Sequence, residues 1–240
     1  MKTLPSLTIF FPAFNDEHSL ASLINTAYIV GKKVSYSLEV MVIDDGSTDG
    51  TATALTNLQK THKTLRVISH KKNEGYGVTV SDGIGQATKE FIFYTDGDGQ
   101  YDVGELRKLI DGLDDEVDIV NGWKVERSDP WYRRLVGMSY QTAMRWAFQL
   151  PIRDVDCDFR LMRAALVKEL PLQSASGGIC VELIKKAQMA GARFAEVPVR
   201  HYPRKYGTSQ FFQLGRIGQT FLELVHTWFD MAICNTRSHL

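Results

Sequence analysis

The sequence predicts an α/β protein with a mostly parallel central β-sheet covered by helices on both faces. Short apolar runs alternate with helical stretches through the first half of the chain, and each run ends in a cluster of Asp, Asn, Gly or Ser. The chain has 240 residues, of which 44% are hydrophobic and 23% charged, as in an ordinary globular protein. Alternation of this kind indicates βαβ units, whose parallel strands are buried on both faces.

The strands and helices of the first half follow one another regularly. Strands are predicted at 7–11, 38–43, 65–68 and 91–94. Helical stretches follow them at about 19–30, 49–61, 77–88 and 103–113. Because ligands bind outside the carboxyl ends of parallel strands, we expect the polar clusters to meet at one edge of the sheet.

The second half is less regular. We expect a strand at 117–120, a mobile polar loop at 124–130, helices near 132–148 and 178–190, and a strand at 193–199. No repeat, low-complexity tract or linker interrupts the sequence. Residues 1–210 are therefore predicted to form one catalytic domain.

Residues 211–240 are predicted to form an amphipathic helical tail. Apolar residues recur at helical spacing from Phe211 to Phe229, among only a few ionisable groups. Such a helix docks on its own domain, pairs two subunits as a homodimer, or lies in the plane of a membrane surface. The longest stretch without Asp, Glu, Lys or Arg, 18–31, is too polar and too short to span a bilayer, since spanning takes about 20 apolar residues.

Charge and cysteine content exclude several classes of protein. The 28 basic and 28 acidic side chains balance, which argues against a nucleic-acid partner. The scattered Cys157, Cys180 and Cys234 form neither a disulfide framework nor a zinc motif. We therefore expect a cytoplasmic protein, able to lie on the cytoplasmic face of a membrane.

The strongest chemical signal follows the fourth predicted strand. Asp96 and Asp98, separated by Gly97, can converge on one divalent cation. Hard oxygen ligands suit Mg²⁺ or Mn²⁺ and leave coordination positions for substrate phosphates. The alternative is an ordinary acidic turn, because Asp and Gly populate turns for backbone reasons alone.

Two further clusters favour nucleotide binding. Asp44 and Asp45 follow the second strand, where an acid can accept hydrogen bonds from a ribose or a base, although small polar residues there also begin helices. The glycines of the 71–77 loop allow a close approach to phosphate, and Lys72 adds charge. Neither a Walker A loop nor a dinucleotide fingerprint occurs.

Taken in chain order, the clusters at 12–17, 44–47, 73–75 and 96–100 resemble the successive signatures of family 2 glycosyltransferases of the GT-A fold. Downstream, 154–160, 196–199 and 201–209 resemble the branch of dolichol-phosphate mannosyltransferase and related polyprenyl-phosphate glycosyltransferases. Three residues depart from that branch: Asp158 replaces its usual glycine, Asp156 a frequent threonine, and Tyr76 a frequent basic residue.

The resemblance implies a set of site residues. Those expected to bind the nucleotide sugar are Pro12, Ala13, Asn15, Glu17, Asp44, Asp45, Lys72, Asn73, Gly75 and Asp96. Those expected to bind the metal are Asp96, Asp98 and Gln100. Those expected near the acceptor's phosphate are Lys124, Arg133, Arg134, Ser139 and Ser209, although the arginine pair is equally typical of a solvated helix face. The catalytic residues are expected to be Asp98, Asp154 and Arg204.

The implied activity is inverting, metal-dependent transfer of a hexose from GDP-mannose or a UDP-hexose to a polyprenyl or dolichyl phosphate. A phosphate acceptor needs no strong general base, whereas a sugar hydroxyl, the alternative acceptor, needs a carboxylate to take its proton. Asp154 is then the first candidate and Asp156 the second. A non-catalytic nucleotide-sugar-binding protein is a further alternative, and a nucleotidyltransferase is disfavoured because its basic loop is missing after the first strand.

Overall fold

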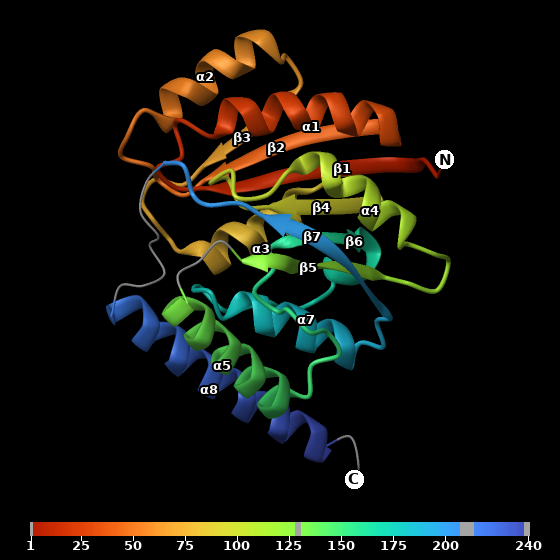
Figure 1. The fold of residues 1–240 in the computed structure, drawn as a ribbon, viewed down its shortest axis with the longest axis vertical. Coiled ribbons are helices and arrows are strands. Elements are labelled where there is room, and N and C mark those ends of the chain that lie inside the picture. The colour runs from red at the N-terminus through yellow and green to blue at the C-terminus, as the bar shows by residue number, and fades with distance from the viewer. Residues whose placement is uncertain (1, 128–130, 207–213, 238–240) are drawn as a thin grey trace.

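The computed structural model describes residues 2–127, 131–206 and 214–237. In these ranges the strands are β1 (Leu4–Ala13), β2 (Ser35–Asp44), β3 (Leu65–Ser69), β4 (Phe91–Thr95), β5 (Ile119–Arg127), β6 (Phe159–Arg163) and β7 (Phe194–His201). The helices are α1 (Leu20–Val34), α2 (Thr51–Thr61), α3 (Tyr76–Gln86), the 3₁₀ turn η1 (Val103–Glu105), α4 (Leu106–Asp111), α5 (Trp131–Phe148), α6 (Ala164–Val167), α7 (Ile179–Met189) and α8 (Leu214–Arg237). Figure 1 shows the sheet between layers of helices.

The described strands form one sheet in the order β3-β2-β1-β4-β6-β5-β7. All neighbouring pairs are parallel except the two that involve β6, which runs antiparallel to β4 and β5. We call the edge at which β1, β2, β4 and β5 end the carboxyl edge. Because β6 runs the other way, its first residue, Phe159, pairs with Thr95 at the end of β4. The acidic segment 154–158 therefore arrives at the same edge as Asp96.

Apolar side chains on the two faces of the sheet form two cores. Ile9 and Phe11 of β1 pack with Ile24 of α1 on one face. On the other face, Phe10 belongs to a core that includes Val80 of α3. A central strand buried on both faces is a near-continuous apolar run, and residues 9–13 of β1 show this pattern in the sequence. The predicted mostly parallel sheet with helices on both faces is confirmed.

The second half differs from expectation in two places. Strand β6 was not predicted, because its two arginines, Arg160 and Arg163, interrupt the apolar pattern. Residues Lys124–Arg127, expected in a loop, belong to β5 and pair with β7, with an irregularity between them. The rest of that expected loop, 128–130, lies outside the described residues.

The tail forms α8, as its helical spacing predicts. It lies beside α5 on the side of α7 away from the sheet (Figure 1), and Trp228 Nε1 donates a hydrogen bond to the carbonyl of Ala147 (3.0 Å). In the part of the chain that the structure describes, every helix is too short or too polar to cross a bilayer.

Candidate active site

The acidic turn after β4 is held tightly against the end of β1. The Gly97 N–H donates to the carbonyl of Pro12 (3.1 Å), and a Cβ at position 97 would lie 2.8 Å from that oxygen. Ser19, just before α1, donates from Oγ to the Gly97 carbonyl (2.5 Å). Only glycine allows this approach, so the local sequence fixes both flanking carboxylates at the carboxyl edge.

Asp98 is brought together with Arg204, which lies beyond the end of β7. Asp98 Oδ1 accepts the Gln100 N–H (2.9 Å), and Oδ2 forms an ion pair with Arg204 Nη2 (2.5 Å). Burial raises the pKa of Asp98, and the Arg204 guanidinium opposes that rise. The Gln100 side chain does not join the carboxylates, because its amide donates to the carbonyl of Tyr202 (3.0 Å).

Asp96 lies in a more negative environment. Its Oδ1 accepts the hydroxyl of Tyr76 (2.8 Å). Burial, together with the charges of Asp158 and Asp98, raises the pKa of Asp96 well above its ordinary value. Carboxylates that repel one another inside a protein are stabilised by a cation, and hard oxygen ligands suit Mg²⁺ or Mn²⁺.

The acidic turn supplies only some of the ligands that a metal ion needs. Over 2–127, 131–206 and 214–237, no three His, Cys, Asp or Glu side chains are grouped as a complete cation site. Asp96 and Asp98 therefore fit an ion that takes its remaining ligands from water or from a substrate, as Mg²⁺ does at phosphate sites.

The carboxylate of Asp45 ties two predicted clusters together. It accepts the N–H groups of Glu74 (2.8 Å) and Gly75 (3.0 Å) and contacts Nδ1 of His70 (2.8 Å). His70 Nε2 lies 3.0 Å from Asp82 Oδ2. Burial lowers the pKa of His70, but its hydrogen bonds to the two carboxylates and their charges outweigh burial and raise it. Asp45 thus holds the 73–75 loop to the end of β2.

The remaining predicted nucleotide residues meet at the same edge. Asn15 takes a left-handed backbone (φ +59°) that directs its Oδ1 to the Thr48 N–H (2.8 Å). The Glu17 N–H approaches Asp49 Oδ2 (3.5 Å). Pro12 and Ala13 are buried at the end of β1, and buried Asp44 accepts the Ser47 N–H. Lys72 is exposed, and Asn73 donates a hydrogen bond to the Asp45 carbonyl.

The acidic segment before β6 faces Lys124. Asp154 accepts the Lys124 N–H (3.0 Å) and a hydrogen bond from Gln141 of α5. Lys124 Nζ donates to the carbonyl of Asp156 (2.7 Å). Burial raises the pKa of Asp156 to about 6, Lys124 opposes it, and Asp154 and Asp158 add to it.

The expected acceptor residues on α5 are only partly described. Ser139 is exposed on that helix. Arg133 and Arg134 lie in the helix by their backbone, but their side chains are outside the described structure, as is all of Ser209.

Arg160, a buried cation next to the acidic turn, is not among the site residues predicted from the sequence. Arg160 is fully buried and donates to Asn121 Oδ1 (2.6 Å), to the Tyr94 hydroxyl (2.5 Å) and to the carbonyl of Val155. Its guanidinium lies 3.6 Å from Asp158 Oδ1, which also accepts the Tyr94 hydroxyl (3.2 Å). Asp158, which departs from the branch pattern, is therefore the counter-ion of Arg160. The sequence signal for this ion pair is an arginine that stands among apolar residues directly after three acidic residues.

Comparison with known proteins identifies the fold and the chemistry. The family model described as glycosyl transferase family 2 matches residues 8–170. The chain belongs to glycosyltransferase family 2. It is 24% identical over 237 residues to undecaprenyl-phosphate 4-deoxy-4-formamido-L-arabinose transferase of Proteus mirabilis (strain HI4320), covering 98% of this chain and 69% of that protein.

Solved structures show the same architecture as this family 2 glycosyltransferase. Glucosyl-3-phosphoglycerate synthase from Mycobacterium tuberculosis, with Mn²⁺, UDP and glucosyl-3-phosphoglycerate, has a TM-score of 0.70 at 16% identity, over 94% of this chain and 79% of that one. The same enzyme with Mn²⁺ and UDP-glucose has a TM-score of 0.69 at 17% identity, over 94% and 78%. These likenesses confirm the GT-A fold.

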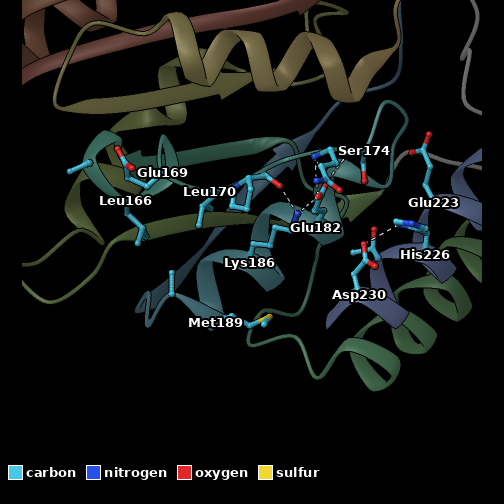
Figure 2. Close-up of a pocket in the computed structure, with 15 residues that line it drawn as sticks. Leu166, Glu169, Leu170, Ser174, Glu182, Lys186, Met189, Glu223, His226 and Asp230 are labelled. Atoms are coloured by element: carbon cyan, nitrogen blue, oxygen red, sulfur yellow. Dashed lines mark hydrogen bonds and ion pairs between the residues drawn. The ribbon is translucent and has the colours of Figure 1, made fainter. Parts of the chain in front are cut away.

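A separate groove of about 810 Å³ lies between α6, α7 and α8 of this glycosyltransferase. Figure 2 shows Leu166 and Glu169 at one end, Glu182 and Lys186 in the middle, and residues of α8 at the other end. Its lining is mostly apolar and contains none of the site residues predicted from the sequence. The groove therefore lies apart from the acidic turn.

Proposed function

We propose that this protein is an inverting, metal-dependent glycosyltransferase that moves a hexose from a GDP- or UDP-sugar to a polyprenyl phosphate. The observation that carries the proposal is the pair of half-buried Asp96 and buried Asp98, set at the carboxyl edge with Arg204 against Asp98. The Proteus mirabilis relative, named for undecaprenyl phosphate, supports the acceptor class. The Mycobacterium tuberculosis structures with UDP and Mn²⁺ support the donor and metal classes.

The reaction is a displacement at the anomeric carbon. An acceptor phosphate oxygen bonds to that carbon while the bond to the diphosphate oxygen breaks, and the nucleoside diphosphate leaves with the electron pair. Asp96 and Asp98 would hold Mg²⁺ or Mn²⁺, which, when bound, neutralises charge growing on the leaving diphosphate. Arg204, already at Asp98, adds a fixed positive charge at the same place.

The acceptor side needs positioning more than proton transfer. A phosphate with a second pKa of about 6 is largely dianionic near neutral pH, so its oxygen attacks without a general base. We infer that Lys124, whose ammonium donates to the Asp156 carbonyl and also lies 3.7 Å from Asp154 Oδ1, supplies a cation for that phosphate. Holding the two reactants in line is then the main task of the protein.

A sugar hydroxyl is the second candidate acceptor, and one observation favours keeping it. Burial raises the pKa of Asp156 to about 6, toward the range that suits a general base at neutral pH. Asp154, the first candidate from the sequence, has its two carboxylate oxygens bonded to the Lys124 N–H and to Gln141. If the acceptor is a hydroxyl, Asp156 is the better base.

The test is donor binding and transfer by an Asp98→Ala variant. Melting temperatures are measured with UDP-glucose and with GDP-mannose, with and without Mn²⁺, since a ligand of the folded state raises the melting point by mass action. One of the two donors should raise the melting temperature of the wild type, and only when Mn²⁺ is present. Asp98→Ala should lose that increase and should also lose most of the transfer to undecaprenyl phosphate. Asp111→Ala, which removes an exposed acid paired with Arg107 on α4, is the control. Full metal-dependent transfer by Asp98→Ala would overturn the proposal.

We further propose that α8 is the contact to the membrane that carries the acceptor. Its exposed apolar side chains are Phe221, Leu222, Val225, Trp228 and Phe229. At 100° per residue these fall within about 120° of the helix surface, next to the face that packs on the domain. An apolar stripe of this kind suits an in-plane membrane helix, and pairing of two subunits is the alternative.

A further inference from the structure

The glycine turn that carries Tyr76 is covered by a segment far away in the sequence. The Gly77 N–H donates to the Ala175 carbonyl (2.9 Å). A Cβ at Gly75, where φ is +110°, would lie 2.3 Å from the same oxygen, and a Cβ at Gly77 would lie 2.0 Å from the Ser174 carbonyl. The backbone of 173–177 therefore packs directly on the turn, whose Tyr76 donates to Asp96.

Two carboxylates hold that segment in place. Glu182 of α7, which is 1% exposed, accepts the N–H groups of Gln173 (3.0 Å) and Ser174 (2.8 Å). Glu223 of α8 accepts both the N–H (3.0 Å) and the hydroxyl (2.6 Å) of Ser176 through one oxygen, Oε2. The first carboxylate comes from a core helix, whereas the second comes from the tail.

The Glu223 contact is built for a negative charge. Ser176 Oγ also accepts the Gly178 N–H (3.2 Å) at the amino end of α7, where the helix dipole favours an anion. Gln219, one turn earlier on α8, donates to Glu223 Oε1 (2.9 Å) and orients the carboxylate. Figure 2 shows Glu223 at the α8 end of the groove. Through Glu223 the tail helix thus makes a directed, charge-assisted contact with the segment that covers the turn.

We propose that Glu223 is a positioning residue of the donor site: through Ser176 it holds the 173–177 segment on the Gly75–Gly77 turn and so keeps Tyr76 on Asp96. The inference rests on the proposed function, because it takes Asp96 to be part of the donor site. It makes α8 a working part of that site. A membrane or a second copy that contacts the apolar stripe of α8 acts on the helix that steadies the donor turn.

The experiment measures nucleotide binding and backbone exchange in the full chain. Isothermal titration with UDP and with GDP, each with MnCl₂, gives affinity, and amide hydrogen exchange reports on 75–77. Glu223→Ala should weaken nucleotide binding about tenfold, or about 1.4 kcal/mol, and speed exchange at 75–77. Glu223→Gln should fall between the wild type and Glu223→Ala, because its amide oxygen still accepts the Ser176 N–H but without the charge of the carboxylate. Asp230→Ala, on the same helix and paired with His226, should change neither measurement.

Several results would overturn the inference. Glu223→Ala could bind nucleotide and exchange like the wild type, or Asp230→Ala could lose as much as Glu223→Ala. Ser176→Ala removes only the hydroxyl and should weaken binding about threefold, so it decides the matter if Glu223→Ala fails to fold. A wild-type chain that binds neither nucleotide would refute the proposed function, whereas the exchange comparison at 75–77 would still test the coupling.

Discussion

Replacing Arg160 with methionine should destabilise the fold strongly. Arg160 is 0% exposed, and methionine fills much of its volume without its charge. The change leaves Asp158 buried without its cation and removes the donors to Asn121 Oδ1 and the Val155 carbonyl. Removing one partner of a buried ion pair costs about 3–5 kcal/mol, because the other charge stays behind uncompensated. We expect a loss of that size.

Urea unfolding followed by circular dichroism measures the loss directly, provided that the slope with denaturant is unchanged. Arg163→Met is the matched control on the same strand: Arg163 is partly exposed and should cost about 1 kcal/mol or less. The double variant Arg160→Met with Asp158→Asn should recover about 1–3 kcal/mol, since the uncompensated charge is then gone. A loss below about 1 kcal/mol for Arg160→Met, or no recovery in the double variant, would refute the ion-pair reasoning.

Three further predictions concern the donor loops and the tail. The carboxylate partners of His70 raise its pKa, so its protonated form stabilises the fold fully below about pH 6.5. This stabilisation is lost, and the melting temperature falls, as the pH rises through the pKa of His70 in the folded state. His70→Asn should make the melting temperature less dependent on pH over this range. Gly75→Ala, at φ +110°, should cost about 1–3 kcal/mol and weaken nucleotide binding in a titration with Mn²⁺. The double variant Phe221→Ser with Phe229→Ser should co-sediment less with phosphatidylglycerol–phosphatidylethanolamine vesicles than the wild type does. If light scattering instead shows a wild-type dimer that the double variant does not form, the apolar stripe of α8 is a contact between subunits.

The first half of the fold could be predicted because burial on both faces leaves a plain trace in the sequence. Residues 9–13 of β1 and 91–94 of β4 are apolar without interruption, and α1 buries one apolar stripe. Strand β6 carries no such trace, since Arg160 is buried there only because Asp158, Asn121 and Tyr94 surround it in three dimensions. The pattern of apolar residues in a sequence does not show which distant residues neutralise a buried charge.

The same division holds at the site. Parallel strands end at one edge, so the clusters after β1, β2 and β4 had to meet, and the acidic turn could be placed from the sequence. The contacts that hold the clusters could not be derived, because they join loops whose relative position depends on the packed sheet. Asp45 binding the N–H of Gly75 and Glu223 binding Ser176 are of this kind. Neither pair has a local sequence signal.

The departures from the branch pattern act together on the acidic turn. By the resemblance to the polyprenyl-phosphate branch, Tyr76 replaces a frequent basic residue and Asp158 replaces a usual glycine. The structure brings both side chains to Asp96. Arg160 forms an ion pair with Asp158, and Arg204 forms one with Asp98. Among the described residues, Asp96 accepts the neutral Tyr76 hydroxyl, and the charge of Arg204 only partly offsets the rise in its pKa. Partial burial weakens the screening of the remaining charge by water, and the divalent cation that we propose would relieve it. The metal affinity that we propose for this turn would therefore depend on what surrounds Asp96 as much as on the acidic pair.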